Sequence, residues 1–258
     1  MHAGETANLF TRFVRKPESL CSCRAHATEC PVWAPALAAA RTDASFHEWD
    51  AAKAIVAIVQ RGEAPTPALT RACSTVLHEA ARLTEAQTLV DSSNWPAYGA
   101  MLHAVAGGRV SYIHLVRDPR AAIHSRTRRG VRRRLRGRSS ARVVGSVVHD
   151  SHRWNQWNRE AAALAGLGAP FVTIRYEDLV DDPHEVLAHA TNTLGLPELD
   201  VTHGSVERSR LHVIWGNRGA VAGKTELVAD DRWQTESPKY RQRLCGLLTI
   251  RQRRVHGY

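Results

Sequence analysis

The stretch Val110-Ser-Tyr-Ile-His-Leu-Val-Arg117-Asp118-Pro119-Arg120 is a short apolar run that ends in charged residues and a proline. Its apolar and β-branched residues predict a buried strand, and Pro119 stands where a helix would begin. Ligands of open α/β folds bind outside the carboxyl ends of parallel strands. The sequence therefore predicts that Arg117 faces a ligand-binding crevice.

Two further apolar runs, at 88–90 and 171–176, also predict strands, and helical patterns lie between the three. Strands that alternate with helices indicate a parallel sheet covered on both faces. We therefore expect a three-layer α/β fold, organised as a single domain over residues 1–258. A short acidic turn is expected after Tyr176. The expected helices cover 31–41, 50–60, 67–83, 96–106, 120–127, 143–167, 183–194 and 238–255.

Basic residues outnumber acidic ones by 35 to 25, and 31 of the 35 are arginines. Arginine suits planar partners such as phosphate or sulfate, although codon bias in a GC-rich genome would account for the same excess. No apolar run approaches the roughly 20 residues that span a bilayer, and the N-terminus lacks a signal-peptide layout. The five cysteines imply no disulfide framework. These features predict a cytoplasmic protein with reduced thiols and no membrane partner.

Nine of the seventeen residues from Arg126 to Arg142 are arginine. So dense a run of like charge predicts a mobile segment unless an anion gathers it. Such a segment can be a lid over an anionic ligand, or it can bind nucleic-acid phosphates. The run contains no aromatic residue on which bases could stack, which favours the lid and argues against a nucleic-acid partner.

Ser125 follows Arg117 by eight residues, roughly two helical turns. A guanidinium and a hydroxyl that converge on one anion make a good phosphate site. The alternative is that Arg117 pairs with Asp118 and that Ser125 is an ordinary helix residue.

Several segments, in order, resemble the PAPS-dependent sulfotransferases of bacteria, which move a sulfuryl group from 3′-phosphoadenosine 5′-phosphosulfate (PAPS) to a hydroxyl or amine. The pair Arg117 and Ser125 after a strand and a proline is similar to the segment of that family that binds the 3′-phosphate. The other matching segments are Cys21-Ser-Cys23 with Cys30-Pro-Val-Trp33, Val90-Asp91-Ser92-Ser93, Tyr176-Glu-Asp-Leu179, Leu194-Gly-Leu-Pro197, His212 through Asn217, Asp231-Arg-Trp233 and the terminal Tyr258.

The resemblance implies a sulfotransferase fold related to the P-loop NTPases, PAPS as co-substrate, a small-molecule or glycan acceptor and no metal. It assigns Arg117 and Ser125 to the 3′-phosphate, with Asn217 and Arg218 as further cofactor-binding candidates. A base must take the acceptor's proton. The catalytic candidates are His149, His212 and Asn94, and no base can be assigned among them; the oligomeric state is equally unassigned.

The sequence also departs from the family pattern. We find no Gly-rich loop of the kind that holds the 5′-phosphosulfate, so the chain is expected to lack that loop and the first strand. Asn94 stands where many relatives carry lysine, and Arg218-Gly219-Ala220 lacks a second arginine. These departures keep two alternatives open: a non-catalytic remnant that binds adenosine 3′,5′-bisphosphate, and a basic nucleic-acid-binding protein.

Two weaker patterns concern a nucleotide-binding loop and a metal site. Gly219 to Thr225 has three residues between its glycines where a nucleotide-binding P-loop needs four, which favours an ordinary loop. Cys21, Cys23, Cys30 and His26 could supply four zinc ligands, but their spacing lacks the usual C-x2-C pair. Because the resemblance accounts for these residues without a metal, we expect no metal site.

Overall fold

The computed structural model describes residues 2–107, 109–134, 140–197, 212–213 and 228–258. They belong to two compact units, one formed by residues 1–110 and 202–226 and the other by residues 111–201 and 227–258. Each unit contains one pair of parallel strands, which confirms the helix-rich α/β class and the parallel pairing. Within the described ranges, none of the helices combines the length and the apolar character needed to cross a membrane.

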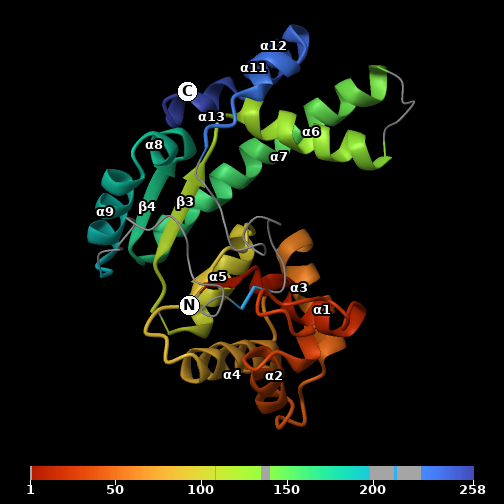
Figure 1. Ribbon diagram of the computed structural model, residues 1–258, viewed down its shortest axis with the longest axis vertical. Helices are drawn as coiled ribbons and strands as arrows, with labels where there is room; N and C mark the ends of the chain where they lie inside the picture. Colours follow the sequence, from red (N-terminus) through yellow and green to blue (C-terminus); the bar gives the residue numbers. More distant parts are fainter. Residues whose placement is uncertain (1, 108, 135–139, 198–211, 214–227) are drawn as a thin grey trace. The chain divides into compact units, whose positions relative to one another are not determined.

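The first unit is mostly helical and pairs a short strand near the N-terminus with a second one (Figure 1). Local sequence fixes the start of helix α4 (Pro67–Leu83). Thr66 Oγ1 accepts a hydrogen bond from Leu69 N (3.2 Å), and Pro67 occupies the first turn of the helix. The elements of the first unit are β1 (His2–Gly4), η1 (Thr6–Asn8), α1 (Leu9–Arg15), η2 (Ala27–Glu29), α2 (Trp33–Ala40), α3 (Glu48–Arg61), α4 (Pro67–Leu83), β2 (Val90–Asp91) and α5 (Pro96–Val105).

The core of the first unit is built around α2. Trp33 and Leu37 are completely buried there, and Phe10 of α1 packs edge to face on Phe46 with ring centroids 5.5 Å apart. A polar network ties the N-terminal segment to β2: Thr6 Oγ1 donates to the Asp91 carboxylate and lies 2.9 Å from the Tyr98 hydroxyl. Burial raises the pKa of Asp91. The Val90-Asp91-Ser92-Ser93 segment thus has a structural task in this unit.

The second unit contains the strand that the motif predicted. Its elements are β3 (Tyr112–Val116), α6 (Pro119–Arg134), α7 (Ser140–Ala163), η3 (Leu164–Leu167), β4 (Phe171–Arg175), α8 (Tyr176–Asp181), α9 (Pro183–Leu194), α11 (Arg232–Glu236), α12 (Lys239–Leu248) and α13 (Ile250–Val255).

Strands β3 and β4 run parallel and side by side, with Val116 opposite Arg175 (Figure 1). Val172 and Ile174 of β4 pack with Ala190 and Leu194 of α9 in a small apolar core. Because the two strands end at the same register, the residues that follow them, from Arg117 and from Tyr176, share one edge of the sheet.

Two expectations for this unit were wrong. The acidic turn after Tyr176 is the helix α8, which begins directly at the end of β4. The expected final helix is two helices, α12 and α13, with Thr249 between them. The expected helix 120–127 lies within α6, which continues to Arg134, and the expected helix 143–167 overlaps α7, which begins at Ser140.

Candidate active site at the end of strand β3

Arg117 lies at the carboxyl edge of β3, as predicted. Its guanidinium stacks on the ring of Tyr176, with Cζ 4.5 Å from the ring centroid. One terminal nitrogen donates to the backbone oxygen of Asp230 (2.8 Å), and the Asp230 carboxylate lies 3.6 Å away. About a fifth of the side chain (22%) is exposed. The stacking and the Asp230 contact hold the guanidinium in place without covering it.

One donor of this guanidinium is unsatisfied. The Nε atom of Arg117 is buried and has no hydrogen-bond partner among the described residues. An unsatisfied buried donor is costly, and the loss is greater for a charged group. An oxyanion is the partner that best fits a guanidinium, because it accepts two parallel charge-assisted hydrogen bonds. This edge of the sheet is therefore chemically suited to a phosphate or sulfate group.

Asp118 pairs with Arg120 and not with Arg117, so the pairing of Arg117 with Asp118 that the sequence left open is wrong; that Ser125 is an ordinary helix residue stays an open alternative. The carboxylate of Asp118 instead accepts from Arg120, with Nε 3.0 Å from Oδ1 and 3.1 Å from Oδ2. Asp118 Oδ1 also accepts from the backbone N–H of Arg120 (2.7 Å), which is the contact of a helix N-cap. Asp118 thus starts α6 and neutralises Arg120, whereas Arg117 contacts Tyr176 and Asp230.

The C-terminal residue braces the same edge. The Tyr258 hydroxyl lies 3.1 Å from the backbone oxygen of Val116 and donates to the Glu177 carboxylate. The other oxygen of Glu177 accepts from the backbone N–H of Asp118 (3.1 Å). Burial, followed by the hydrogen bond to Glu177, raises the pKa of Tyr258. The backbone on both sides of Arg117 is therefore fixed by Tyr258 and Glu177.

The sequence analysis assigned no role to Glu177 or to Asp230. A role for Glu177 could have been predicted, since it belongs to the Tyr176-Glu-Asp-Leu179 segment that resembles the family. A role for Asp230 could not, because its contact with Arg117 joins residues 113 positions apart in the chain.

The other predicted binding residues have different outcomes. Ser125 is half-buried on α6, six residues and about 9 Å of helix rise beyond Pro119. Asn217 and Arg218 lie outside the described residues. The assignment of Ser125, Asn217 and Arg218 to the nucleotide stays a prediction.

The three catalytic candidates lie in different surroundings. His149 is exposed on α7 of the second unit, and Asn94 is exposed after β2 of the first. His212 is buried in the first unit, where its Nδ1 lies 3.4 Å from the sulfur of Cys30. The surroundings of His212 favour a structural role over proton transfer, and no residue is assigned as the base.

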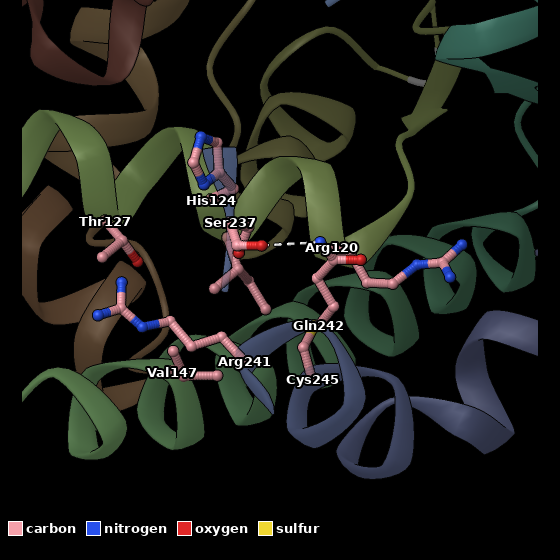
Figure 2. Close-up of a pocket in the computed structure, with 9 residues that line it drawn as sticks. Arg120, His124, Thr127, Val147, Ser237, Arg241, Gln242 and Cys245 are labelled. Carbon is pink, nitrogen blue, oxygen red and sulfur yellow. Dashed lines mark hydrogen bonds between the residues drawn. The ribbon is translucent and has the colours of Figure 1, made fainter. Parts of the chain in front are cut away.

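Two hollows lie near α6 and α12. One, between α6, α7 and α12, measures about 20 Å³, which is room for a single water molecule. Figure 2 shows the residues around it, including the hydrogen bond from Gln242 Nε2 to Ser237 O (2.8 Å). The other hollow is wide, about 530 Å³, and four of its lining residues are cations: Arg120, Lys239, Arg243 and Arg253. The first hollow is a packing gap, whereas the second is large enough for an anionic ligand.

Comparison with known proteins decides the family. The sequence matches a family model described as the sulfotransferase family over residues 10–200, about three quarters of the chain. The chain belongs to the sulfotransferase family. The matched range of this chain includes β3, Arg117, Ser125 and the Tyr176-Glu-Asp-Leu179 segment. Family membership supports a transferase activity.

This member of the family is also similar to a solved structure, the sulfotransferase domain from the curacin biosynthetic pathway. The two are 19% identical, the match covers 93% of this chain and 83% of that one, and the TM-score is 0.45. No curated protein sequence is similar enough to count as a match.

Proposed function

We propose that this protein is a cytoplasmic PAPS-dependent sulfotransferase that acts on a hydroxyl or amine of a small molecule or glycan. The observation that carries the proposal is the guanidinium of Arg117 at the carboxyl edge of β3, with its buried Nε unsatisfied among the described residues. In a member of the sulfotransferase family, the 3′-phosphate of the donor is the anion that suits this position.

In the proposed reaction, Arg117 and Ser125 hold the 3′-phosphate, and Asn217 and Arg218 assist in binding the nucleotide. The acceptor oxygen or nitrogen attacks the sulfur in line. The bond from sulfur to the 5′-phosphate oxygen breaks, adenosine 3′,5′-bisphosphate leaves, and the proton of the acceptor passes to a base. Asn94 can donate a hydrogen bond to the transferred group but supplies no charge to stabilise the transition state.

The test is a calorimetric titration of the full chain with adenosine 3′,5′-bisphosphate and, in parallel, with adenosine 5′-phosphate. We expect micromolar binding of the bisphosphate and about 10- to 100-fold weaker binding of the monophosphate, because a charge-assisted hydrogen bond contributes about 1.5 to 3 kcal/mol. Equal affinities would show that the 3′-phosphate is not recognised, and the proposal would fail. Binding of the bisphosphate without sulfuryl transfer to any acceptor in a panel would indicate the non-catalytic remnant.

Asp230 is expected to weaken anion binding, since its carboxylate lies 3.6 Å from the Arg117 guanidinium. Its hydrogen bond with Arg232 lowers the pKa of Asp230 to about 2, so the carboxylate is ionised at neutral pH. Asp230→Asn keeps the backbone oxygen that Arg117 contacts and removes the negative charge. We expect the affinity for adenosine 3′,5′-bisphosphate to rise about two- to fivefold, the range of exposed ion pairs.

The matched control is Asp181→Asn, which removes one exposed carboxylate from α8 of the same unit. If both variants raise the affinity equally, only net charge matters. If Asp230→Asn binds no better than the wild type, its carboxylate does not face the bound anion.

A further inference from the structure

Three cysteines and one histidine converge in the first unit. Cys21, Cys23, Cys30 and His212 each direct one potential ligand atom into a cluster in which all four atoms lie within 4.8 Å of one another. Cys30 Sγ is 3.7 Å from Cys21 Sγ and 3.8 Å from Cys23 Sγ. The Nδ1 atom of His212 is 3.4 Å from Cys30 Sγ and 4.0 Å from Cys21 Sγ. All three thiols are free.

Four of the six separations are close to those of a tetrahedral metal site, and the other two are no longer than 4.8 Å. A zinc ion with sulfur ligands at about 2.3 Å and a nitrogen ligand at about 2.0 Å places two sulfurs about 3.8 Å apart and a sulfur and a nitrogen about 3.5 Å apart. The separations of Cys30 Sγ from the other two sulfurs agree with the first value, and the two sulfur-to-nitrogen separations lie on either side of the second. The sulfurs are far outside the 2.05 Å of a disulfide bond.

The backbone around the cysteines supports thiolate ligands. A tight turn follows Cys21, in which Arg24 N donates to Cys21 O (2.8 Å) and Arg24 has a positive φ of 72°. The backbone N–H of Cys23 donates toward the sulfur of Cys21. Those of Val32 and Trp33 donate toward the sulfur of Cys30. Such donors stabilise a negatively charged sulfur.

His212 is held against this turn by three hydrogen bonds of its own segment. Ser22 N donates to Val213 O (2.9 Å), and Val213 N donates to Ser22 Oγ (2.9 Å). The indole Nε1 of Trp33 donates to His212 O (2.6 Å). With its backbone clamped in this way, the imidazole of His212 is fixed with Nδ1 toward the sulfurs.

The cluster is buried in the first unit. Cys21 and Cys30 are 2% and 0% exposed, and His212 is 7% exposed. Thiolates gathered in so small a buried volume need a positive ion to balance their charge.

We propose that Cys21, Cys23, Cys30 and His212 bind one zinc ion as a structural site. Four protein ligands with sulfur and nitrogen atoms in tetrahedral spacing are typical of structural zinc, whereas a catalytic site leaves one position open. This proposal differs from the expectation, drawn from the sequence, that the chain has no metal site. The nitrogen ligand also differs from the candidate that the sequence offered, because His26 is exposed and its Nδ1 lies 3.2 Å from Glu18 O.

The ion would join two segments that are far apart in the chain, since Cys30 and His212 are 182 positions apart. Closing so long a loop costs conformational entropy, and a metal bond between its ends offsets that cost. Removal of the metal is therefore expected to destabilise the first unit.

The test is to measure the zinc content of the full chain by elemental mass spectrometry. The chain is purified under reducing conditions without added metal. We expect about one zinc per chain, and a thiolate-to-metal charge-transfer absorption when cobalt(II) replaces zinc. Cys23→Ser removes a half-buried ligand, and His212→Ala removes the nitrogen ligand. Both variants are expected to lose most of the zinc and the charge-transfer band.

The controls are Cys73→Ser, a buried thiol of α4 outside the cluster, and His26→Ala, and both should keep the zinc. A folded wild-type chain with neither zinc nor a cobalt charge-transfer band would overturn the proposal, whatever the variants do. Loss of zinc from His26→Ala but not from His212→Ala would overturn the ligand set. If the purified chain holds no metal and its mass is lower than that of the reduced chain by two hydrogen atoms, two of these cysteines form a disulfide and the zinc proposal fails.

Discussion

Arg117→Ala is expected to weaken binding of adenosine 3′,5′-bisphosphate by about 10- to 100-fold, the loss of about 1.5 to 3 kcal/mol that accompanies removal of a charge-assisted hydrogen bond. The guanidinium of Arg117 is already oriented by the ring of Tyr176 and by Asp230, so little side-chain entropy is lost when an anion binds. Calorimetric titration of the wild type and the variant measures the effect.

Two further variants make this result specific to the guanidinium. Arg71→Ala removes an exposed arginine that pairs with Asp43 in the first unit, and it should leave the affinity unchanged. Arg117→Lys keeps the charge but not the planar pair of donors, and we expect an intermediate affinity. If Arg71→Ala weakens binding as much as Arg117→Ala does, net charge accounts for the effect and Arg117 is not at the binding site.

Trp33→Ala is expected to lower the free energy of unfolding by about 3 to 5 kcal/mol, the range for removal of a large buried aromatic side chain. Trp33 is 0% exposed at the start of α2, and its indole N–H donates to His212 O. The variant therefore leaves a cavity in the core and an unsatisfied carbonyl. Urea unfolding followed by circular dichroism measures the change.

Trp49→Ala is the matched control in the same unit. Trp49 is 46% exposed on α3 and contacts the cations of Arg15 and Lys53. Its removal should cost about 1 kcal/mol at most. Equal losses from the two tryptophans would contradict the burial of Trp33. Trp33→Phe removes the N–H donor and keeps most of the buried aromatic side chain. Its loss of unfolding free energy should be smaller than that of Trp33→Ala, and it measures mainly the hydrogen bond to His212 O.

Local signals predicted several elements well. The expected helix 183–194 matches α9, because Asp182 Oδ1 accepts from Glu185 N (3.0 Å), Pro183 occupies the first turn and Gly195 ends the helix with a φ of 64°. The expected helix 67–83 matches α4 for similar reasons. The strand before Arg117 was predicted because a short apolar run followed by Pro119 has few alternatives.

Contacts between distant residues could not be predicted from one sequence. The arginine run was expected to repel itself, yet Arg126 lies 3.4 Å from Asp150 of α7 and Arg128 lies 3.0 Å from Glu236 of α11. Its counterions come from other elements, so α6 can continue. His212 was likewise absent from the predicted metal ligands because spacing alone favours a nearby histidine such as His26. Long-range contacts of this kind decide both candidate sites.

The most direct test of the central claim is a crystal structure of the full chain with adenosine 3′,5′-bisphosphate. The 3′-phosphate is predicted within about 2.7 to 2.9 Å of the Arg117 guanidinium, the usual length of such charge-assisted bonds, with the Ser125 hydroxyl on the same phosphate. A nucleotide bound elsewhere, for example in the basic hollow beside Lys239 and Arg243, with Arg117 still held by Asp230, would contradict the account.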